Sequence, residues 1–499
     1  MNKQYESTRN RNMKATASEA ILKGLSKDGG LFVPMKLDEL KISLDTLENK
    51  NYQQIAQTIL ALFFQDFRED QIVSSVEKAY DNKFCTDEIV PIVKVGEDFI
   101  MELFHGKTLA FKDIALSILP YLMKYAQENC QSQEHILILT ATSGDTGKAA
   151  LEGFKGVKGI DIIVFYPEEG VSQIQKLQMI TQEGENTHVV SIKGNFDDAQ
   201  NGVKIIFNDL SNEKELESLG IKLSSANSIN IGRLVPQITY YFTTYEKLVS
   251  QSEIKRGEFV NFVVPTGNFG NILAGYFAKR MGLPINKLIC ASNENHVLRD
   301  FIHTGIYDVN RDFVKTNSPS MDILISSNLE RLLYYLSGQD NDYITSIMTD
   351  LKTKKHYEVN DTIKEKLKDE FWSSYCTESE TLETIKLVYD KHDYVMDTHT
   401  AVAYKASQDY KKATNDKTKT VILSTASPYK FIESVYQALF GVNSHNDFKL
   451  LKALSEITKR PIPKSIAELE NMKIIHDRKC QPTGMFEEIL KIVKEDIAL

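Results

Sequence analysis

Cysteine is scarce in this chain, and its five copies are widely scattered. They are Cys85, Cys130, Cys290, Cys376 and Cys480 in a sequence of 499 residues. Because the number is odd and no two of them form a C-x-x-C pair, the sequence argues against a disulfide scaffold and against a zinc site. The pattern fits a reducing cytoplasm, and we predict no metal.

Long hydrophobic runs are also missing. No uninterrupted apolar stretch approaches the roughly 20 residues that span a membrane, and the opening MNKQYESTRNRNMKA lacks an apolar stretch of signal-peptide length. We therefore expect a soluble protein that is located in the cytoplasm and has no membrane partner.

Positive charge is not in excess. The chain has 59 lysine and arginine residues against 68 aspartate and glutamate residues, which gives a net charge of −9. This balance gives no reason to expect nucleic acid or an anionic membrane surface as a partner. A site that binds phosphate must then create its own local positive potential.

The length predicts two or three domains, because one hydrophobic core rarely organises 499 residues. We expect a mostly helical N-terminal domain over residues 1–92 and an α/β core over 93–445, with a helix-rich excursion at about 310–395. Residues 446–499 are expected to form a C-terminal helical segment. Within the core, short apolar runs alternate with helical patterns, which is typical of parallel sheets covered on both faces.

Three turns that follow apolar runs of this core are the predicted binding loops. They lie at residues 140–148, 265–271 and 424–430. In open α/β sheets, ligands bind beyond the carboxyl ends of the strands. We therefore expect these three loops to meet at one site.

The second of these loops contains the turn GNFGN at residues 267–271, directly before a helical pattern. Amides at a helix start have no partners in the helix, the macrodipole adds positive charge there, and two glycines allow a ligand to approach closely. The turn matches neither G-x-G-x-x-G nor the Walker pattern. From the turn alone, a phosphate site and a simple helix cap are equal alternatives.

The first loop reads TSGDTGKAA at residues 142–150. It is not a Walker motif, because Thr142 stands where the first glycine is required. Its amides suit a carboxylate as well as a phosphate. The alternative is that Ser143 and Asp145 only cap the following helix.

Lys112 stands in the apolar context LAFKDIA. Such a lysine either extends its amine to the surface or is truly desolvated, and desolvation leaves a neutral, nucleophilic amine that can form a Schiff base. A lysine of this kind, a phosphate cradle and a second amide-rich loop together predict pyridoxal 5′-phosphate (PLP), which is both an aldehyde and a phosphate ester.

Five motifs occur in the order seen in the threonine synthase family of bacterial and fungal type: LFHGKTLAFKD, ILTATSGDTGKAA, NSINIGRLVPQITYYF, PTGNFGNILAG and LSTASPYKF. The N-terminal stretch ending in SKDGGLFVP resembles the family too, so the resemblance covers nearly the whole chain. It implies the α/β fold of fold-type II PLP enzymes, similar to tryptophan synthase β, with two parallel-sheet lobes and a helical N-terminal domain.

The resemblance also implies a reaction. O-phospho-L-homoserine and water would become L-threonine and phosphate, by γ-elimination and β-addition of water, in the last step of threonine biosynthesis. We expect a monomer or a homodimer, since the sequence does not choose between them.

The resemblance implies a role for each motif. Lys112 matches the lysine that binds the cofactor covalently, Thr425 the hydroxyl near the pyridine nitrogen, and Asp145 a group near the 3′ oxygen. The cofactor phosphate is implied to lie on Gly267, Asn268, Phe269, Gly270 and Asn271. The substrate carboxylate is implied to bind Thr142, Ser143, Gly144, Asp145 and Thr146.

A phosphate that leaves with a charge of about −1.5 to −2 requires a second anion site. The segment SSANSINIGR at residues 224–233 is the predicted one, through Ser225, Asn227, Ser228 and the guanidinium fork of Arg233. The alternative is a capped helix start with Arg233 in a salt bridge.

Three further features have less specific interpretations. His105 is expected to be a hydrogen-bonded structural residue, although it is also a candidate phosphate ligand. Lys107 replaces a proline that is common in the family, and it either points to solvent or adds to the field that attracts the substrate. The segment MDTHTAVAYKA at residues 396–406 is predicted to serve packing.

Two other functions are possible. One is dehydration or β-replacement on the same fold, against which the long N-terminal domain and SSANSINIGR argue. The other is a protein that binds PLP without catalysis, which we would expect to lack Lys112 or the glycine turn.

Overall fold

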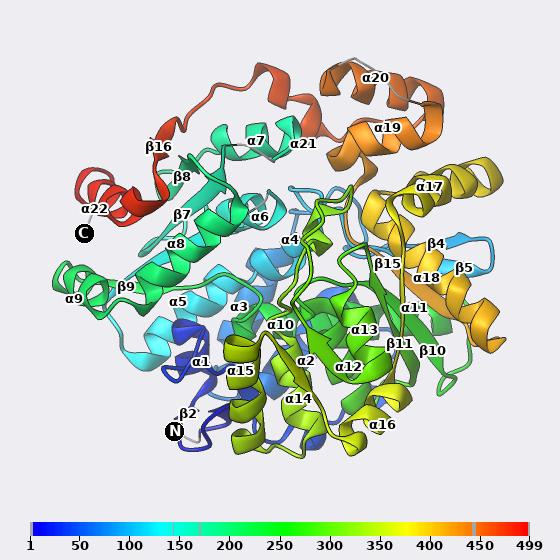
Figure 1. Ribbon diagram of the computed structural model, residues 1–499, viewed down its shortest axis with the longest axis horizontal. Coiled ribbons are helices and arrows are strands. Elements are labelled where there is room, and N and C mark those ends of the chain that lie inside the picture. The colour runs from blue at the N-terminus through cyan, green and yellow to red at the C-terminus, as the bar shows by residue number, and fades with distance from the viewer. Residues whose placement is uncertain (1–2, 143, 169–170, 442–445, 498–499) are drawn as a thin grey trace.

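The computed structural model describes residues 3–142, 144–168, 171–441 and 446–497. Two large sheets form two lobes, and the N-terminal region packs beneath them in the view of Figure 1. The prediction of two parallel-sheet α/β lobes is confirmed. In the described ranges, no helix combines the length and the apolar character needed to cross a membrane.

The first lobe contains a five-stranded sheet, in the order β16-β8-β7-β6-β9, in which every pair is parallel. Its strands are β6 (His135–Ala141), β7 (Ile160–Pro167), β8 (Thr187–Ile192), β9 (Ile221–Ser224) and β16 (Arg478–Cys480). Its helices are α5 (Leu119–Cys130), α6 (Asp145–Phe154), α7 (Gln173–Ile180), α8 (Phe196–Asn208) and α9 (Leu210–Ser218).

Alternation along β6 shows why both faces of this sheet are covered. Ile136 and Ile138 join the core that contains α6, whereas Leu137 and Leu139 join a second core with α8. Successive side chains of a strand point to opposite faces, so a continuous apolar run requires helices on both sides.

The second lobe contains a six-stranded sheet in the order β14-β11-β10-β15-β5-β4, which is parallel except for the β4–β5 hairpin. Its strands are β4 (Ile92–Val95), β5 (Asp98–Glu102), β10 (Val260–Pro265), β11 (Ile285–Ser292), β14 (Phe371–Tyr375) and β15 (Thr420–Ser424). Its helices are α4 (Lys112–Leu116), α10 (Ile231–Leu234), η3 (Val235–Gln237), α11 (Ile238–Ser250), α12 (Gly270–Arg280), α13 (Val297–Thr304), α17 (Glu378–His392), α18 (Thr398–Thr414), η5 (Pro428–Phe431) and α19 (Ile432–Phe440).

The N-terminal region is less purely helical than predicted, because it also holds a small antiparallel sheet of order β2-β1-β3. Its elements are β1 (Tyr5–Ser7), β2 (Lys14–Ala15), α1 (Ala17–Lys23), β3 (Phe32–Pro34), η1 (Leu37–Glu39), η2 (Leu44–Leu47), α2 (Tyr52–Phe63) and α3 (Glu69–Tyr80). Strands of two or three residues leave too little periodic signal to be predicted.

The excursion before residue 395 is helix-rich, as predicted, but its strand β14 also extends the six-stranded sheet beside β11. Its other elements are β12 (Ile306–Asp308), η4 (Pro319–Met321), α14 (Leu329–Leu336), α15 (Asn341–Lys354), β13 (His356–Glu358) and α16 (Asp361–Glu370).

The C-terminal segment runs from one lobe to the other, from α20 beside α19 to α22 beside the five-stranded sheet (Figure 1). Its elements are α20 (Asp447–Thr458), α21 (Lys464–Ala467), η6 (Leu469–Asn471), β16, η7 (Pro482–Gly484) and α22 (Met485–Glu495). The sequence predicted the helices but not β16, which pairs with β8.

Candidate active site

Lys112 is placed by a segment that crosses between two strand ends. After β5 ends at Glu102, the amide of Leu103 donates to the Ser424 carbonyl and the amide of Phe111 donates to the Thr425 carbonyl, each at 2.9 Å. Helix α4 then begins at Lys112. The lysine side chain is only 11% exposed, so its amine lies inside the protein rather than at the surface.

The amine of Lys112 contacts a serine and a carboxylate. Its Nζ lies 3.2 Å from Ser320 Oγ and 3.7 Å from Asp145 Oδ2. Burial lowers the pKa of Lys112 to about 8, and the nearby cations Arg233 and Lys430 act in the same direction while Asp145 opposes them. Near pH 8 a large fraction of this amine is therefore neutral and nucleophilic.

Asp145 is the first residue of α6 and the centre of a buried charge network. Its Oδ1 lies 2.8 Å from Lys430 Nζ, and its Oδ2 accepts a hydrogen bond from Ser320 Oγ at 3.0 Å. Burial alone would raise the pKa of Asp145, but Lys430 and Lys112 outweigh burial and hold the pKa well below its ordinary value. Asp145 is therefore ionised at neutral pH.

Lys430 was not predicted as a site residue. This lysine is fully buried in η5, and its Nζ also donates to the Thr108 carbonyl at 2.8 Å. It thereby ties Asp145 of the first lobe to the segment that leads to Lys112. The signal was available, because Lys430 lies in the predicted loop 424–430.

Ser320 and His399 were also missed. Ser320 lies in η4, and its backbone amide donates to His399 Nε2 at 3.1 Å, while His399 Nδ1 lies 2.7 Å from Asp397 Oδ2. The segment 396–406 thus positions the loop that contacts Lys112, in addition to the packing role predicted for it. No local sequence pattern connects Ser320 with Lys112.

The glycine turn is tightly enclosed. An added Cβ on Gly267 would lie 2.8 Å from the Ser320 carbonyl oxygen, so this position has no room for a side chain. Phe269 adopts φ of +62°, a left-handed conformation that is uncommon for a residue other than glycine. The side chain of Asn271 donates to the Pro265 carbonyl at 3.1 Å and so closes the turn.

The amides of this turn are available to a ligand. Across the described part of the chain, no acceptor is recorded for the backbone amides of Asn268, Phe269 and Gly270. They lie at the N-terminus of α12, where the helix dipole is positive. The Asn268 carbonyl is held by the backbone and side-chain amides of Asn328 at 3.1 and 3.0 Å.

The turn before α6 has a similar design. Thr142 Oγ1 accepts hydrogen bonds from the amides of Gly144 and Gly147, both at 2.9 Å, so this hydroxyl stabilises the turn. Gly144 has φ of +139°, and a Cβ there would lie 2.5 Å from the Gln175 side chain. The amides of Asp145 and Thr146 have no acceptor among the described residues. Ser143 lies outside the described residues.

Arg233 is buried without a counter-charge. Its side chain donates to the Ala226 carbonyl at 2.7 Å, and no ion pair involves it in the described ranges. Burial lowers the pKa of Arg233 to about 10. Among the described residues, Arg233 therefore forms no salt bridge of the kind named as the alternative to an anion site, and a buried cation without an anion favours binding of an anionic ligand.

The segment around Arg233 lies against the glycine turn. Ser228 Oγ accepts a hydrogen bond from Asn328 Nδ2 at 3.0 Å, and a Cβ on Gly270 would lie 3.4 Å from the Cβ of Ser228. Ser225 Oγ accepts the amide of Asn227 at 3.1 Å, and Asn227 itself is half-buried.

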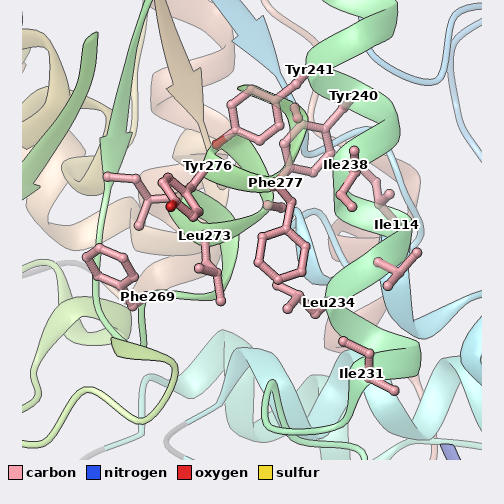
Figure 2. Close-up of a cluster of buried hydrophobic side chains, with 14 of the residues drawn as sticks. Ile114, Ile231, Leu234, Ile238, Tyr240, Tyr241, Phe269, Leu273, Tyr276 and Phe277 are labelled. Atoms are coloured by element: carbon pink, nitrogen blue, oxygen red, sulfur yellow. The ribbon is translucent and has the colours of Figure 1, made fainter. Parts of the chain in front are cut away.

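A shared hydrophobic cluster fixes these parts relative to one another. Figure 2 shows buried side chains that come from α4, α10, α11 and α12. They include Ile114, which follows Lys112 by two positions, Leu234, which follows Arg233, and Phe269 of the glycine turn. A close-packed core is hardly compressible. Lys112, Arg233 and the glycine turn therefore keep fixed positions relative to one another.

Two further predicted candidates lie outside this cluster. Lys107 is 55% exposed and pairs with Glu152 at 3.0 Å, which agrees with the alternative that it points to solvent. His105 Nε2 contacts Glu102 Oε2 at 2.7 Å, so this histidine is hydrogen-bonded within the protein.

The donor set fits PLP. It offers a buried amine with a lowered pKa, amides at the glycine turn that no described residue accepts from, and the buried residue Thr425, whose carbonyl binds the amide before Lys112. An aldehyde requires such an amine, and a phosphate ester requires such a cradle.

Comparisons with known proteins also indicate a PLP-dependent enzyme. Three family models match: Threonine synthase N terminus at residues 4–80, Pyridoxal-phosphate dependent enzyme at 99–426, and Threonine synthase, C-terminal at 400–477. Threonine synthase from Saccharomyces cerevisiae is 38% identical over 91% of this chain and 94% of its own length. Threonine synthase-like 1 from Homo sapiens is 42% identical over 85% of this chain, which spans 58% of that relative's length.

Solved structures agree. The crystal structure of PLP-bound threonine synthase from Brucella melitensis is 36% identical with a TM-score of 0.86, covering 98% of this chain and 99% of the other. Yeast threonine synthase is 34% identical with a TM-score of 0.87, covering 99% and 98%. From these matches and the site geometry, the chain belongs to the threonine synthase family of pyridoxal-phosphate-dependent enzymes.

Proposed function

We propose that this protein converts O-phospho-L-homoserine and water to L-threonine and phosphate. The observation that carries the proposal is a buried amine, Lys112, with a buried guanidinium, Arg233, near enough to lower the pKa of that amine, while the described residues supply no counter-charge to Arg233. PLP chemistry needs the amine of Lys112. A substrate that carries its own phosphate needs a second cation, and Arg233 can supply it.

Lys112, the amides of residues 267–271 and Thr425 would hold the cofactor. When bound, PLP supplies an electron sink for charge that develops at Cα of an amino-acid substrate. A threonine hydroxyl does not keep a pyridine nitrogen protonated as a carboxylate would. That choice suits elimination, because a less stabilised carbanion is less prone to side reactions.

The substrate would be held at both ends. The amides of Asp145 and Thr146 at the start of α6, which have no acceptor among the described residues, suit its carboxylate. Arg233, with the hydroxyl of Ser228 and the half-buried Asn227 nearby, suits its phosphate, which carries about −1.5 to −2 charges. Because Arg233 lies within one core with α4 and α12, the phosphate would be oriented relative to Lys112.

Lys112 is the group we assign to proton transfer at Cα. A pKa near 8 leaves it able to accept and return a proton at neutral pH. Ser320 Oγ and Asp145 hold the amine in place through contacts at 3.2 and 3.7 Å. Lys430 acts through Asp145, since it keeps that carboxylate ionised and fixed.

The test combines spectroscopy with product analysis. The purified protein with PLP is mixed with O-phospho-L-homoserine, the cofactor absorbance is recorded, and threonine and phosphate are quantified. We expect both products in equal amounts. Formation of a keto acid and ammonia would instead indicate a dehydratase, and an unchanged spectrum without phosphate release would refute the proposed substrate.

We also propose the three-part division at about residues 92 and 445 and a monomer or homodimer in solution. The models that match at residues 4–80 and 99–426 support the first boundary, whereas the C-terminal model at 400–477 overlaps the core and leaves the second boundary to experiment. Limited proteolysis and light scattering test both, and cleavage confined to the middle of the core would contradict the boundaries.

A further inference from the structure

A cysteine and a histidine meet outside the candidate active site. Cys85 lies after α3, is exposed, and its Sγ is 3.6 Å from His105 Nδ1. The backbone amide of Cys85 also donates to the His105 carbonyl at 2.9 Å, so the two residues are fixed side by side.

A carboxylate orients this histidine from its other side. His105 Nε2 lies 2.7 Å from Glu102 Oε2, and Glu102 Oε1 accepts a hydrogen bond from the Tyr394 hydroxyl at 2.8 Å. Burial alone would lower the pKa of His105, but its contacts with Cys85 and Glu102 outweigh burial and raise the pKa to about 9. The imidazole is therefore protonated at neutral pH and donates from both nitrogens.

A thiol, a cationic imidazole and an orienting carboxylate thus follow one another through successive contacts of 3.6 and 2.7 Å. Reactive cysteines lie in electropositive, partly exposed surroundings, and the cationic imidazole 3.6 Å from the exposed Cys85 sulfur provides such surroundings. The mechanism proposed above uses none of these three residues.

The other cysteines provide a contrast within the same chain. Cys130 is also exposed, but burial and the carboxylates of Glu19 and Asp66 raise the pKa of its thiol. Burial raises the pKa of Cys290 and Cys376 to about 12 and that of Cys480 to about 11. Cys130 therefore serves as a control, because it is exposed like Cys85 but has no imidazole contact among the described residues.

We propose that Cys85 is a reactive thiol and a modification site for low-molecular-weight disulfides. In the reaction, the Cys85 thiolate attacks one sulfur of a reagent RS–SR, and the Cys85–S–SR bond forms as the reagent's S–S bond breaks. The leaving RS⁻ takes up a proton and departs as RSH, so the Cys85 sulfur is oxidised and the departing sulfur is reduced.

A group attached to Cys85 would lie next to the segment that leads to Lys112. His105 lies in the stretch between β5 and α4 that leads to Lys112. The amides of Leu103 and Phe111, at the two ends of this stretch, bind it to the end of β15. A group attached to Cys85 therefore lies against the base of the segment that positions Lys112.

The experiment measures labelling site by site and does not depend on turnover. The full-length protein with PLP is incubated at neutral pH with bis(2-hydroxyethyl) disulfide, a small neutral probe, quenched with acid and analysed by peptide mass spectrometry. We expect Cys85 to react on the order of tenfold faster than Cys130. In His105→Gln and in Glu102→Gln, the rate at Cys85 should fall toward that of Cys130, while Cys130 keeps its own rate.

Two results would overturn the proposal. One is labelling of Cys85 no faster than Cys130 in the unmodified sequence, a comparison that needs no variant to fold. The other is a Cys85 rate that both substitutions leave unchanged. Failure of threonine formation would not affect either readout.

Discussion

The two ends of the candidate active site are built from different groups. At the glycine turn, residues 267–271, three backbone amides have no acceptor in the described part of the chain, and the side chains of Asn271, Ser326 and Asn328, which hydrogen-bond the turn, are uncharged. At the other end, Lys112, Asp145 and Lys430 bring three charges together in the interior, with contacts of 2.8 and 3.7 Å. We call this second group the charge cluster.

The difference reflects what each end must do. A turn at a helix start can bind an anion with fixed dipoles and needs no counter-charge of its own. A group that transfers protons needs a pKa near neutrality. Burial and nearby charges are the means by which a protein shifts the pKa of a side chain. The glycine turn should therefore be sensitive to side-chain volume, and the charge cluster to the removal of charge.

Removing the amine should have the largest effect. Lys112→Ala is expected to lower kcat by on the order of a thousandfold or more, because the substitution deletes the group assigned to proton transfer. Steady-state kinetics measure this. Lys148→Ala is the matched control, since burial likewise lowers the pKa of Lys148 to about 8 but its amine faces Glu152. Comparable losses in both variants would contradict the role of Lys112.

Leaving Asp145 without its cation should come next. Lys430→Met is expected to lower the free energy of unfolding by about 3–5 kcal/mol, because a buried carboxylate loses its partner. Denaturant unfolding measures this, and Lys405→Met, which breaks the partly exposed pair with Asp409, should cost at most about 1 kcal/mol.

A double variant separates charge from packing at this position. Lys430→Met combined with Asp145→Asn should recover part of the lost stability, because the carboxylate that lost Lys430 is then neutral and only the amine of Lys112 is left to accommodate. Equal costs for Lys430→Met and Lys405→Met would show that the charge cluster is not stabilised as described.

Arg233→Met should weaken the second anion site. We expect the KM for O-phospho-L-homoserine to rise about 10- to 100-fold, as for the loss of a charged hydrogen bond, with a smaller rise for Arg233→Lys. Inhibition by inorganic phosphate should weaken in parallel. An unchanged KM together with unchanged phosphate inhibition would assign the substrate phosphate elsewhere.

Adding one methyl group to the glycine turn should act through volume alone. In Gly267→Ala, the new Cβ would lie 2.8 Å from the Ser320 carbonyl oxygen, so PLP affinity is expected to fall about tenfold, with about 1–3 kcal/mol of lost stability. Gly484→Ala is the control, because its Cβ would meet nothing within 4 Å. Titration with PLP, followed by absorbance, measures the affinity. Equal PLP affinity in Gly267→Ala and Gly484→Ala would contradict a tightly enclosed glycine turn.

The pH dependence of cofactor attachment should be the smallest of these effects. Because the pKa of Lys112 is lowered to about 8, its amine is charged and unreactive below that pH and becomes neutral as the pH rises through it. The rate at which the cofactor-free protein attaches PLP at Lys112 should rise about fivefold from pH 7 to pH 8 and about twofold from pH 8 to pH 9. Borohydride trapping with peptide mapping measures it. A rate that keeps rising tenfold per unit beyond pH 9 would mean an ordinary, solvated lysine.

The strands that could be predicted are those with a continuous apolar run. β6, β10 and β15 are the apolar runs that precede the three predicted loops, and they could be expected because burial on both faces requires apolar residues at every position. β14 and β16 were not, since Phe371–Tyr375 follows a charged helix and Arg478–Cys480 has no apolar run. Both are edge strands whose pairing depends on a neighbour elsewhere in the chain.

The same limit applies to the site. Lys112, the glycine turn and the turn before α6 were predicted because each is a contiguous pattern. Ser320 and His399 were not, because their importance consists of contacts with residues far away in the sequence.

The sequence by itself determined which continuous apolar runs form strands of the sheets and which turns carry amides and a potential nucleophile, because hydrophobic periodicity, glycine and helix starts are local properties. Only the tertiary structure decided that Lys430 neutralises Asp145, that Ser320 touches Lys112 and that Arg233 has no carboxylate partner within the described ranges. Charge–charge energies depend on distance and burial, and neither quantity exists until distant segments have packed together.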